Sequence, residues 1–143
     1  FGITHRVYQD WNKRNNREQK DIRDITVVEA KEIYLNRYWI LGKADKMPLP
    51  LCLVHFDSCV NTGIGQASKF LQRAIGADDD GIIGPNTLAS LHEGLNKIGG
   101  LVIANKIIDQ RERFYENLVK LKPSQEVFLK GWLNRTKDLR SKL

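Results

Sequence analysis

The chain has 143 residues, 41% of them hydrophobic and 28% charged, with a formal net charge of +6. This length fits one domain or two very small ones, and the ordinary apolar content excludes a disordered chain. No apolar run approaches the roughly 20 residues that a membrane-spanning helix needs, so we expect no stable membrane insertion.

The N-terminal part is predicted to be a short extended segment, residues 1–4, followed by an irregular or partly helical charged stretch. His5 opens that stretch and is either an acid–base group or simply an exposed histidine. Thr26 and Glu29 form a capping-box pattern, in which each side chain satisfies a backbone N–H of the other residue. A helix is therefore expected to run from there to about Leu41.

Three aromatic residues, Tyr34, Tyr38 and Trp39, fall within about one and a half turns of this helix. Core packing is one interpretation. The other is a sugar-stacking wall, because flat apolar sugar faces pack well on aromatic rings. The pattern alone leaves both open.

A central buried helix is predicted from about Leu49 to Asn61, because its residues are apolar almost all round. Asp57 and Asn61, one turn apart, are polar residues on this otherwise apolar helix. Burying a carboxylate and an amide costs several kcal/mol unless both are hydrogen-bonded. They are expected either to satisfy nearby loop backbone or to open onto a cleft.

The two cysteines, Cys52 and Cys59, lie about two helical turns apart, roughly 10 Å along the axis. A disulfide needs Cα atoms within about 7 Å, so we expect two free thiols in the core, as suits folding in a reducing cytosol. His55 lies between them, but no second pair completes a metal site. No metal and no cofactor are predicted.

The second half shows helical spacing throughout and almost no strand signal. Helices are predicted to end near Gly76, to start at 84–87, to span 101–121 and to carry an apolar face in the last 20 residues, where Val127, Phe128, Trp132, Leu133 and Leu139 recur. The fold class is mostly α, with about six helices. Asp78-Asp79-Asp80-Gly81 lacks the spacing of a calcium loop and predicts a tight turn in which Gly81 has a positive φ.

The last helix is rich in cations, namely Lys130, Arg135, Lys137, Arg140 and Lys142 against Asp138 alone. This pattern is typical of a solvated helix face, or of a surface that attracts a polyanion. A small nucleic-acid binder is the least favoured function. The basic residues alternate with core aromatics, and no helix has the pattern of one that recognises bases.

Taken in order, several pieces of the sequence resemble glycoside hydrolase family 108, the lysozyme-like N-acetylmuramidases of phages and bacteria. The matching pieces are Phe1-Gly2-Ile3-Thr4, Thr26-x-x-Glu29-Ala30, Tyr38-Trp39, Phe56-Asp57 with Val60-Asn61-x-Gly63, Leu71-Gln72, Asp80-Gly81, Gly84-x-x-Thr87 and Gly131-Trp132-Leu133-Asn134-Arg135. The resemblance implies a lysozyme-like helical fold. It assigns residues 1–62 to the remainder of a catalytic lobe and residues 63–143 to a helical module of the peptidoglycan-binding type.

In that family the general acid is a glutamate in a Glu-Gly-Gly-Tyr motif shortly before the Gly-Ile-Thr segment. This chain starts inside that segment, so we expect the acid upstream of Phe1 and no general acid among the 143 residues. The resemblance implies that Thr4, His5, Tyr38, Trp39, Asp57 and Asn61 line the cleft. Asp10, Glu18 and Asp57 are acids that could assist without matching the family's acid.

The expected function of the intact protein is hydrolysis of the peptidoglycan bond between N-acetylmuramic acid and N-acetylglucosamine, in cell lysis or wall remodelling. The alternative is a non-catalytic peptidoglycan-binding or secretion-assisting protein on the same fold. Peptidoglycan is the expected partner, nucleic acid is not, and we expect a monomer. The resemblance further implies synthesis in the cytoplasm, export by a holin or a secretion system, and action at the cell wall or in the periplasm.

Overall fold

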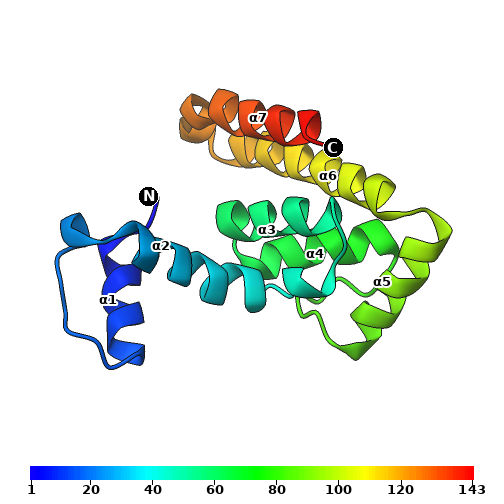
Figure 1. Ribbon diagram of the computed structural model, residues 1–143. Helices are drawn as coiled ribbons and strands as arrows, with labels where there is room; N and C mark the ends of the chain where they lie inside the picture. The colour runs from blue at the N-terminus through cyan, green and yellow to red at the C-terminus, as the bar shows by residue number, and fades with distance from the viewer.

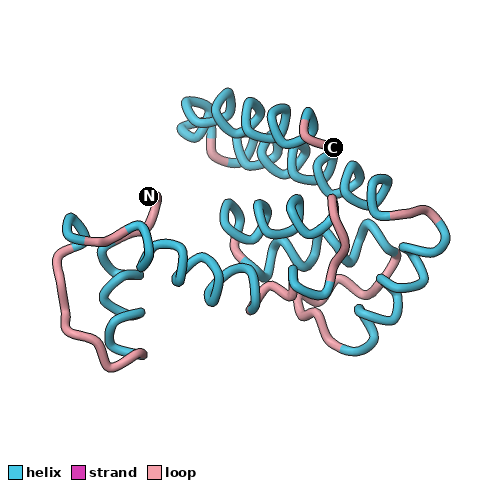
Figure 2. The backbone as a smooth tube through the Cα atoms, in the orientation of Figure 1, coloured by secondary structure: helices cyan, strands magenta, loops and turns pink.

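The computed structural model describes residues 1–143 and contains seven α-helices and no strand (Figures 1 and 2). The mostly helical class is confirmed, but the expected count of about six helices is one too low. The additional helix, α1, lies in the charged N-terminal stretch, which was expected to be irregular or partly helical. None of the helices combines the length and the apolarity that crossing a membrane would require.

Helix α1 (His5–Arg14) follows the extended residues 1–4. It forms despite its charge because the Thr4 hydroxyl caps its first turn, accepting a hydrogen bond from the Val7 N–H at 3.3 Å. The helix lies at one end of the molecule, away from α3, α4 and α5 (Figure 1). It is tied to α2 by the Tyr8 hydroxyl, which donates to Glu29 Oε2 at 2.7 Å.

Helix α2 (Val27–Tyr34) begins at the predicted capping box: Thr26 Oγ1 accepts from the Glu29 N–H at 3.1 Å, and Glu29 Oε1 accepts from the Thr26 N–H at 3.2 Å. Its path continues as a π-helix, Leu35–Ile40, so the helical segment does reach the predicted end but with wider turns. The residue after this segment's last turn is Gly42. Only glycine fits there, because a Cβ would lie 2.4 Å from the Tyr38 carbonyl oxygen and 2.8 Å from Cys59 Sγ.

The rest of the chain forms a helical bundle. Its helices are α3 (Leu51–Thr62), α4 (Ile64–Ile75), α5 (Pro85–Lys97), α6 (Gly100–Leu121) and α7 (Glu126–Ser141). Helices α6 and α7 run antiparallel side by side, above α3 and α4 in Figure 1. These bounds agree with the predicted helices to within a few residues, since glycine and proline mark most of the ends.

One core of 13 buried residues lies among these helices, contributed mainly by α3, α4 and α6. It comprises Met47, Leu51, Cys52, Val54, Phe70, Leu71, Ala74, Leu91, Ile103, Ala104, Ile107, Ile108 and Leu139. The predicted boundary at residues 62/63 therefore falls between two helices that share this core. The expected apolar face of α7 is only partly buried, because Val127 and Phe128 are 79% and 52% exposed.

Both cysteines are free and buried, as the spacing predicted. Burial raises the pKa of the Cys59 thiol to about 12, so it is an inert core group rather than a nucleophile. Burial also lowers the pKa of His55, whose Nε2 lies 2.7 Å from the Gly42 carbonyl oxygen. The histidine thus fastens the end of the π-helical segment to α3.

The aspartate-rich segment is a turn, as predicted. Asp80 Oδ1 accepts hydrogen bonds from the Ile82 N–H at 2.9 Å and from Gln72 Nε2 at 2.8 Å, and Gly81 has a φ of +81°. Asp79 forms an ion pair with Arg73 at 2.7 Å. These carboxylates are therefore engaged in holding the turn against α4.

Candidate functional site

A pocket of about 470 Å³ opens between the α2 segment, α3 and α7, and its walls are mostly apolar. It is lined by Lys31, Tyr34, Leu35, Trp39, Phe56, Asp57, Val60 and Arg135. The pocket exists because α3 turns one face to the core and the adjacent face, carrying Phe56, Asp57 and Val60, away from it.

Aromatic rings form much of the pocket wall. Trp39 meets Phe56 edge to face, with ring centroids 5.3 Å apart. Tyr34 packs on Tyr38 with centroids 5.7 Å apart, and its hydroxyl donates to the Phe1 carbonyl oxygen at 2.5 Å. Because Tyr34, Trp39 and Phe56 are half-buried rather than enclosed, they pack against neighbouring rings and also remain accessible from the pocket.

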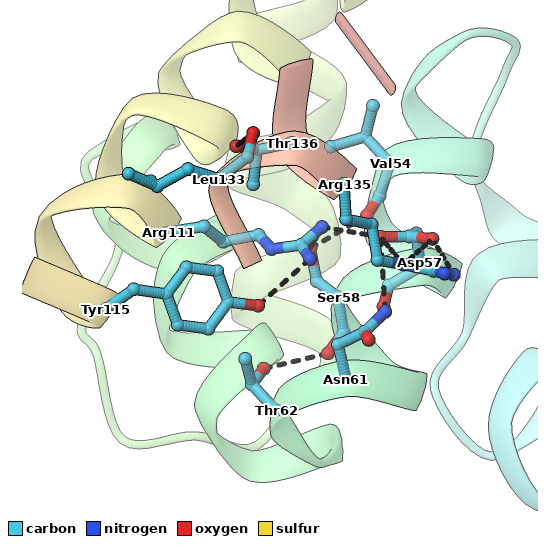
Figure 3. A network of polar contacts seen from close by, with 10 residues as sticks. All are labelled: Val54, Asp57, Ser58, Asn61, Thr62, Arg111, Tyr115, Leu133, Arg135 and Thr136. Atoms are coloured by element: carbon cyan, nitrogen blue, oxygen red, sulfur yellow. Dashed lines mark hydrogen bonds and ion pairs between the residues drawn. The ribbon is translucent and has the colours of Figure 1, made fainter. Parts of the chain in front are cut away.

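The Asp57 carboxylate lies between two arginines that come from different helices (Figure 3). Arg111 of α6 donates from Nη1 to Asp57 Oδ2 at 2.7 Å, and Arg135 of α7 donates from Nη2 to Asp57 Oδ1 at 2.6 Å. The Arg111 side chain is fully buried and that of Asp57 is 12% exposed, whereas that of Arg135 is 53% exposed. The three side chains thus join α3, α6 and α7 at one edge of the pocket.

Further hydrogen bonds hold this ion-pair cluster in place. Arg111 Nη2 donates to the Tyr115 hydroxyl at 3.1 Å, and Arg111 Nη1 lies 3.4 Å from Ser58 Oγ. Asn61 Nδ2 donates to the Asp57 backbone carbonyl at 2.7 Å and to its Oδ2 at 3.3 Å (Figure 3). The hydrogen bonds to Asp57 also raise the pKa of the Arg135 guanidinium.

This geometry defines what Asp57 can do. Both of its oxygens already accept hydrogen bonds from charged donors. A general acid must direct a proton from one carboxyl oxygen toward the leaving group, and here neither oxygen is free to do so. Asp57 is therefore a positioning residue that sets Arg135 at the pocket and fixes α7 against α3.

The structure separates the six predicted cleft residues. Trp39 and Asp57 line the pocket, whereas Asn61 is hydrogen-bonded to Asp57 and Tyr38 packs on Tyr34 without lining it. Asp57 and Asn61 do not satisfy loop backbone, which was one of the two expectations for them. Asp57 is among the residues that line the pocket.

Thr4 and His5 are not among the residues that line this pocket. Thr4 caps α1 and borders a separate polar pocket of about 970 Å³, together with Asp10 and Arg37. His5 Nδ1 accepts a hydrogen bond from the Ile22 N–H at 3.3 Å, which ties α1 to the following turn.

Most carboxylates near the N-terminus are engaged in structural contacts. Asp10 forms ion pairs with Arg14 at 3.1 Å and with Arg37 at 3.5 Å. Glu29 closes the capping box of α2, and its pKa is lowered chiefly by the hydrogen bond that it accepts from Tyr8. No group of three or more His, Cys, Asp or Glu side chains is arranged to hold a metal ion.

Sequence reasoning missed Lys31 and the two arginine partners of Asp57 as site residues. A signal for Arg111 was present, because it falls on the apolar face of α6 among Ile107, Ile108 and Tyr115. A charge at a core position requires a buried partner of opposite charge. Arg135 differed from the other cations of α7 only by its place in the family-like piece Gly131-Trp132-Leu133-Asn134-Arg135, which did not indicate a contact with Asp57.

The remaining charges of α7 are largely paired within the molecule. Arg140 forms ion pairs with Asp109 at 2.9 Å and with Glu112 at 3.5 Å, and Lys142 pairs with Asp138 at 3.0 Å. Arg135 also contacts Asp57, which it shares with Arg111, so three of the five cations of the predicted face lie against a carboxylate. This argues against the polyanion interpretation of the last helix.

Comparison with known proteins assigns both halves of the chain. Residues 1–63 match the family described as Glycosyl hydrolase 108, and residues 66–137 match the family described as Predicted Peptidoglycan domain. The solved structure of SagA from Brucella abortus is similar with a TM-score of 0.80 and 28% identity, over 99% of this chain and 76% of that one. A comparison with curated proteins finds no match. The chain belongs to the family described as Predicted Peptidoglycan domain, and ahead of that domain it carries a segment similar to glycosyl hydrolase 108.

Proposed function

We propose that the protein acts on peptidoglycan as an N-acetylmuramidase, cleaving the bond between N-acetylmuramic acid and N-acetylglucosamine. The observation that carries this proposal is the placement of the pocket. Asp57 lies in the segment matched to glycosyl hydrolase 108, whereas Arg111 and Arg135 lie in the segment matched to the peptidoglycan domain. The ion-pair cluster therefore joins the two segments beside an aromatic pocket of a size and character that suit sugar rings.

Cleavage of a glycosidic bond needs a carboxylic acid that protonates the leaving oxygen, with its pKa raised by an apolar surrounding. Asp57 does not meet this need, because both of its oxygens accept hydrogen bonds from arginines. In glycoside hydrolase family 108 the acid lies in a Glu-Gly-Gly-Tyr motif, and residues 1–143 do not contain this motif. We therefore expect residues 1–143 to bind wall glycan without cleaving it. In this proposal they supply the scaffold and the glycan-binding wall.

The test measures binding and cleavage separately. Residues 1–143 are mixed with purified insoluble peptidoglycan, and both the sedimented protein and the reducing ends released are quantified. Sedimentation with the wall and no new reducing ends are expected. A chain that remains in the supernatant contradicts the glycan-binding role, and released reducing ends show that an acid within residues 1–143 does the chemistry.

A non-catalytic binding or secretion-assisting protein on the same fold is the second candidate, favoured by the structural engagement of Asp10, Glu29 and Asp57. A Glu-Gly-Gly-Tyr segment joined ahead of Phe1 distinguishes the two. The muramidase proposal expects that chain to cleave peptidoglycan and its matched variant, with Gln in place of the motif's Glu, to be inactive. The binding proposal expects neither to cleave. Under both, the protein is made in the cytoplasm and acts at the cell wall or in the periplasm.

A further inference from the structure

We propose that Lys31 and Arg135 form a carboxylate-recognising edge of the aromatic pocket, so that the pocket selects acidic glycan over uncharged glycan. The inference rests on the proposed function, and it names the carboxylate as the substrate group that this pocket recognises. Of the residues that line the pocket, three are charged: Lys31, Asp57 and Arg135. The single carboxylate among them is already paired with two arginines.

Arg135 retains unused hydrogen-bond donors at the pocket. It binds Asp57 through Nε and Nη2 only, and its Nη1 has no partner within the protein. The side chain is 53% exposed, so the free edge of the guanidinium is accessible. Because Asp57 fixes the guanidinium plane, an incoming carboxylate meets a donor whose orientation is already set.

Lys31 supplies a second cation, from α2 on another wall of the pocket. Its ammonium group forms neither a hydrogen bond nor an ion pair, and the residue is exposed. Arg111, behind Asp57, has no exposed surface and cannot reach a ligand, but its charge already balances that of Asp57. Lys31 and Arg135 thus leave the pocket with positive charge that nothing in the chain neutralises.

The occupant that fits these walls has an apolar ring face and a carboxylate. The rings of Trp39 and Phe56 supply a stacking surface, and the two cations supply the anion contact. N-acetylmuramic acid has this chemistry because its lactyl ether ends in a carboxyl group, and a peptide attached there carries carboxylates of its own. N-acetylglucosamine has the ring face without the charge, so it leaves both cations unused.

The experiment is a titration calorimetry series on residues 1–143. The ligands are peptide-free fragments of alternating N-acetylmuramic acid and N-acetylglucosamine, the same fragments with the lactyl carboxyl reduced to an alcohol, chito-oligosaccharides of equal length, and peptide-bearing fragments. The proteins are the unmodified chain, Lys31→Gln and Arg135→Lys. The matched control is Lys137→Gln, since Lys137 is likewise exposed and unpaired but lies outside the pocket.

We expect the unmodified chain to bind carboxylate-bearing fragments about fivefold more tightly than uncharged ones, the scale of a partly exposed charge pair. Lys31→Gln should abolish most of this preference while leaving chito-oligosaccharide binding unchanged, and Lys137→Gln should retain it. A preference already present in peptide-free fragments identifies the lactyl carboxylate as the group bound. A preference found only with peptide-bearing fragments identifies the peptide carboxylates.

Two results overturn the inference alone: equal affinity of the unmodified chain for charged and uncharged fragments, or an undiminished preference in both Lys31→Gln and Arg135→Lys. Either leaves glycan binding, and with it the proposed function, intact. A chain that binds none of the glycans overturns the proposed function as well. Far-ultraviolet circular dichroism of each variant shows that the comparison is made between folded proteins.

Discussion

Replacement of Asp57 by asparagine is the sharpest test of the ion-pair cluster. The variant keeps the shape of the side chain but leaves the fully buried Arg111 with no counter-ion. Removing one partner of a buried ion pair typically costs about 3–5 kcal/mol, because an unpaired charge remains in a low-dielectric interior. Against a usual total of about 5–15 kcal/mol for a domain, that is a large share of the stability.

The second partner of Asp57 provides the internal comparison. Arg135→Gln removes a cation whose side chain is 53% exposed and leaves the Asp57–Arg111 pair at 2.7 Å intact. Exposed ion pairs contribute about 0–1 kcal/mol, so this variant should cost far less than Asp57→Asn. The ranking follows because Asp57→Asn disturbs the contacts of both arginines, the buried one included, whereas Arg135→Gln disturbs only the exposed one.

Urea unfolding followed by circular dichroism measures both free energies of unfolding, with the slope of the transition checked for equality. Arg111→Met completes the series, because the double variant Asp57→Asn/Arg111→Met removes the unpaired charge and should recover part of the loss. Equal costs for Asp57→Asn and Arg135→Gln, or a loss below about 1 kcal/mol for Asp57→Asn, would refute the assignment of Arg111 as a buried, charge-dependent partner.

Three further predictions concern stability. Thr26→Ala removes the α2 capping box and should cost about 1 kcal/mol in urea unfolding, whereas Thr26→Ser should retain most of it; equal costs would contradict the cap. Gly42→Ala places a Cβ 2.4 Å from the Tyr38 carbonyl oxygen and should destabilise by about 1–3 kcal/mol or more, visible as a lower thermal midpoint; an unchanged midpoint would contradict this packing. Because burial lowers the pKa of His55, the unfolded chain binds its proton first, so stability should fall as pH drops below about 6.5, by up to about 1.4 kcal/mol per pH unit. His55→Gln should flatten that fall measurably in unfolding experiments between pH 7 and 5, and an unchanged slope would count against the assignment.

The helices could be predicted because their signals are local. Thr26 and Glu29 lie three residues apart, and Gly42 sits where the helical path must turn, so short-range patterns define this segment. The turn at Gly81 follows from the same kind of evidence. Helix α1 was underestimated because its charges obscured the one residue that starts it, the Thr4 cap.

The candidate site resisted prediction because it depends on contacts between distant residues. Arg135 reaches Asp57 across 78 positions and Arg111 across 54, and no local pattern encodes such distances. The sequence did mark Asp57 as a polar residue on an apolar helix, which says that a partner exists but not which one. His5 illustrates the converse. A histidine suggested an acid–base group, but in the fold its ring accepts a hydrogen bond from the Ile22 N–H and so links α1 to the following turn.

Helix α1 has a different relation to the rest of the molecule from that of the other helices. It contributes no residue to the 13-residue core, and only two of its residues are buried, Asn12 and Tyr8, whose hydroxyl donates to Glu29. Segments with few buried apolar contacts open at a small fraction of the free energy needed to unfold the whole domain. None of the aromatic pocket's lining residues lies in α1, so such local opening leaves that pocket assembled. Local opening of α1 would instead separate Thr4 and Asp10 from Arg37 and so would take apart the polar pocket that these residues line.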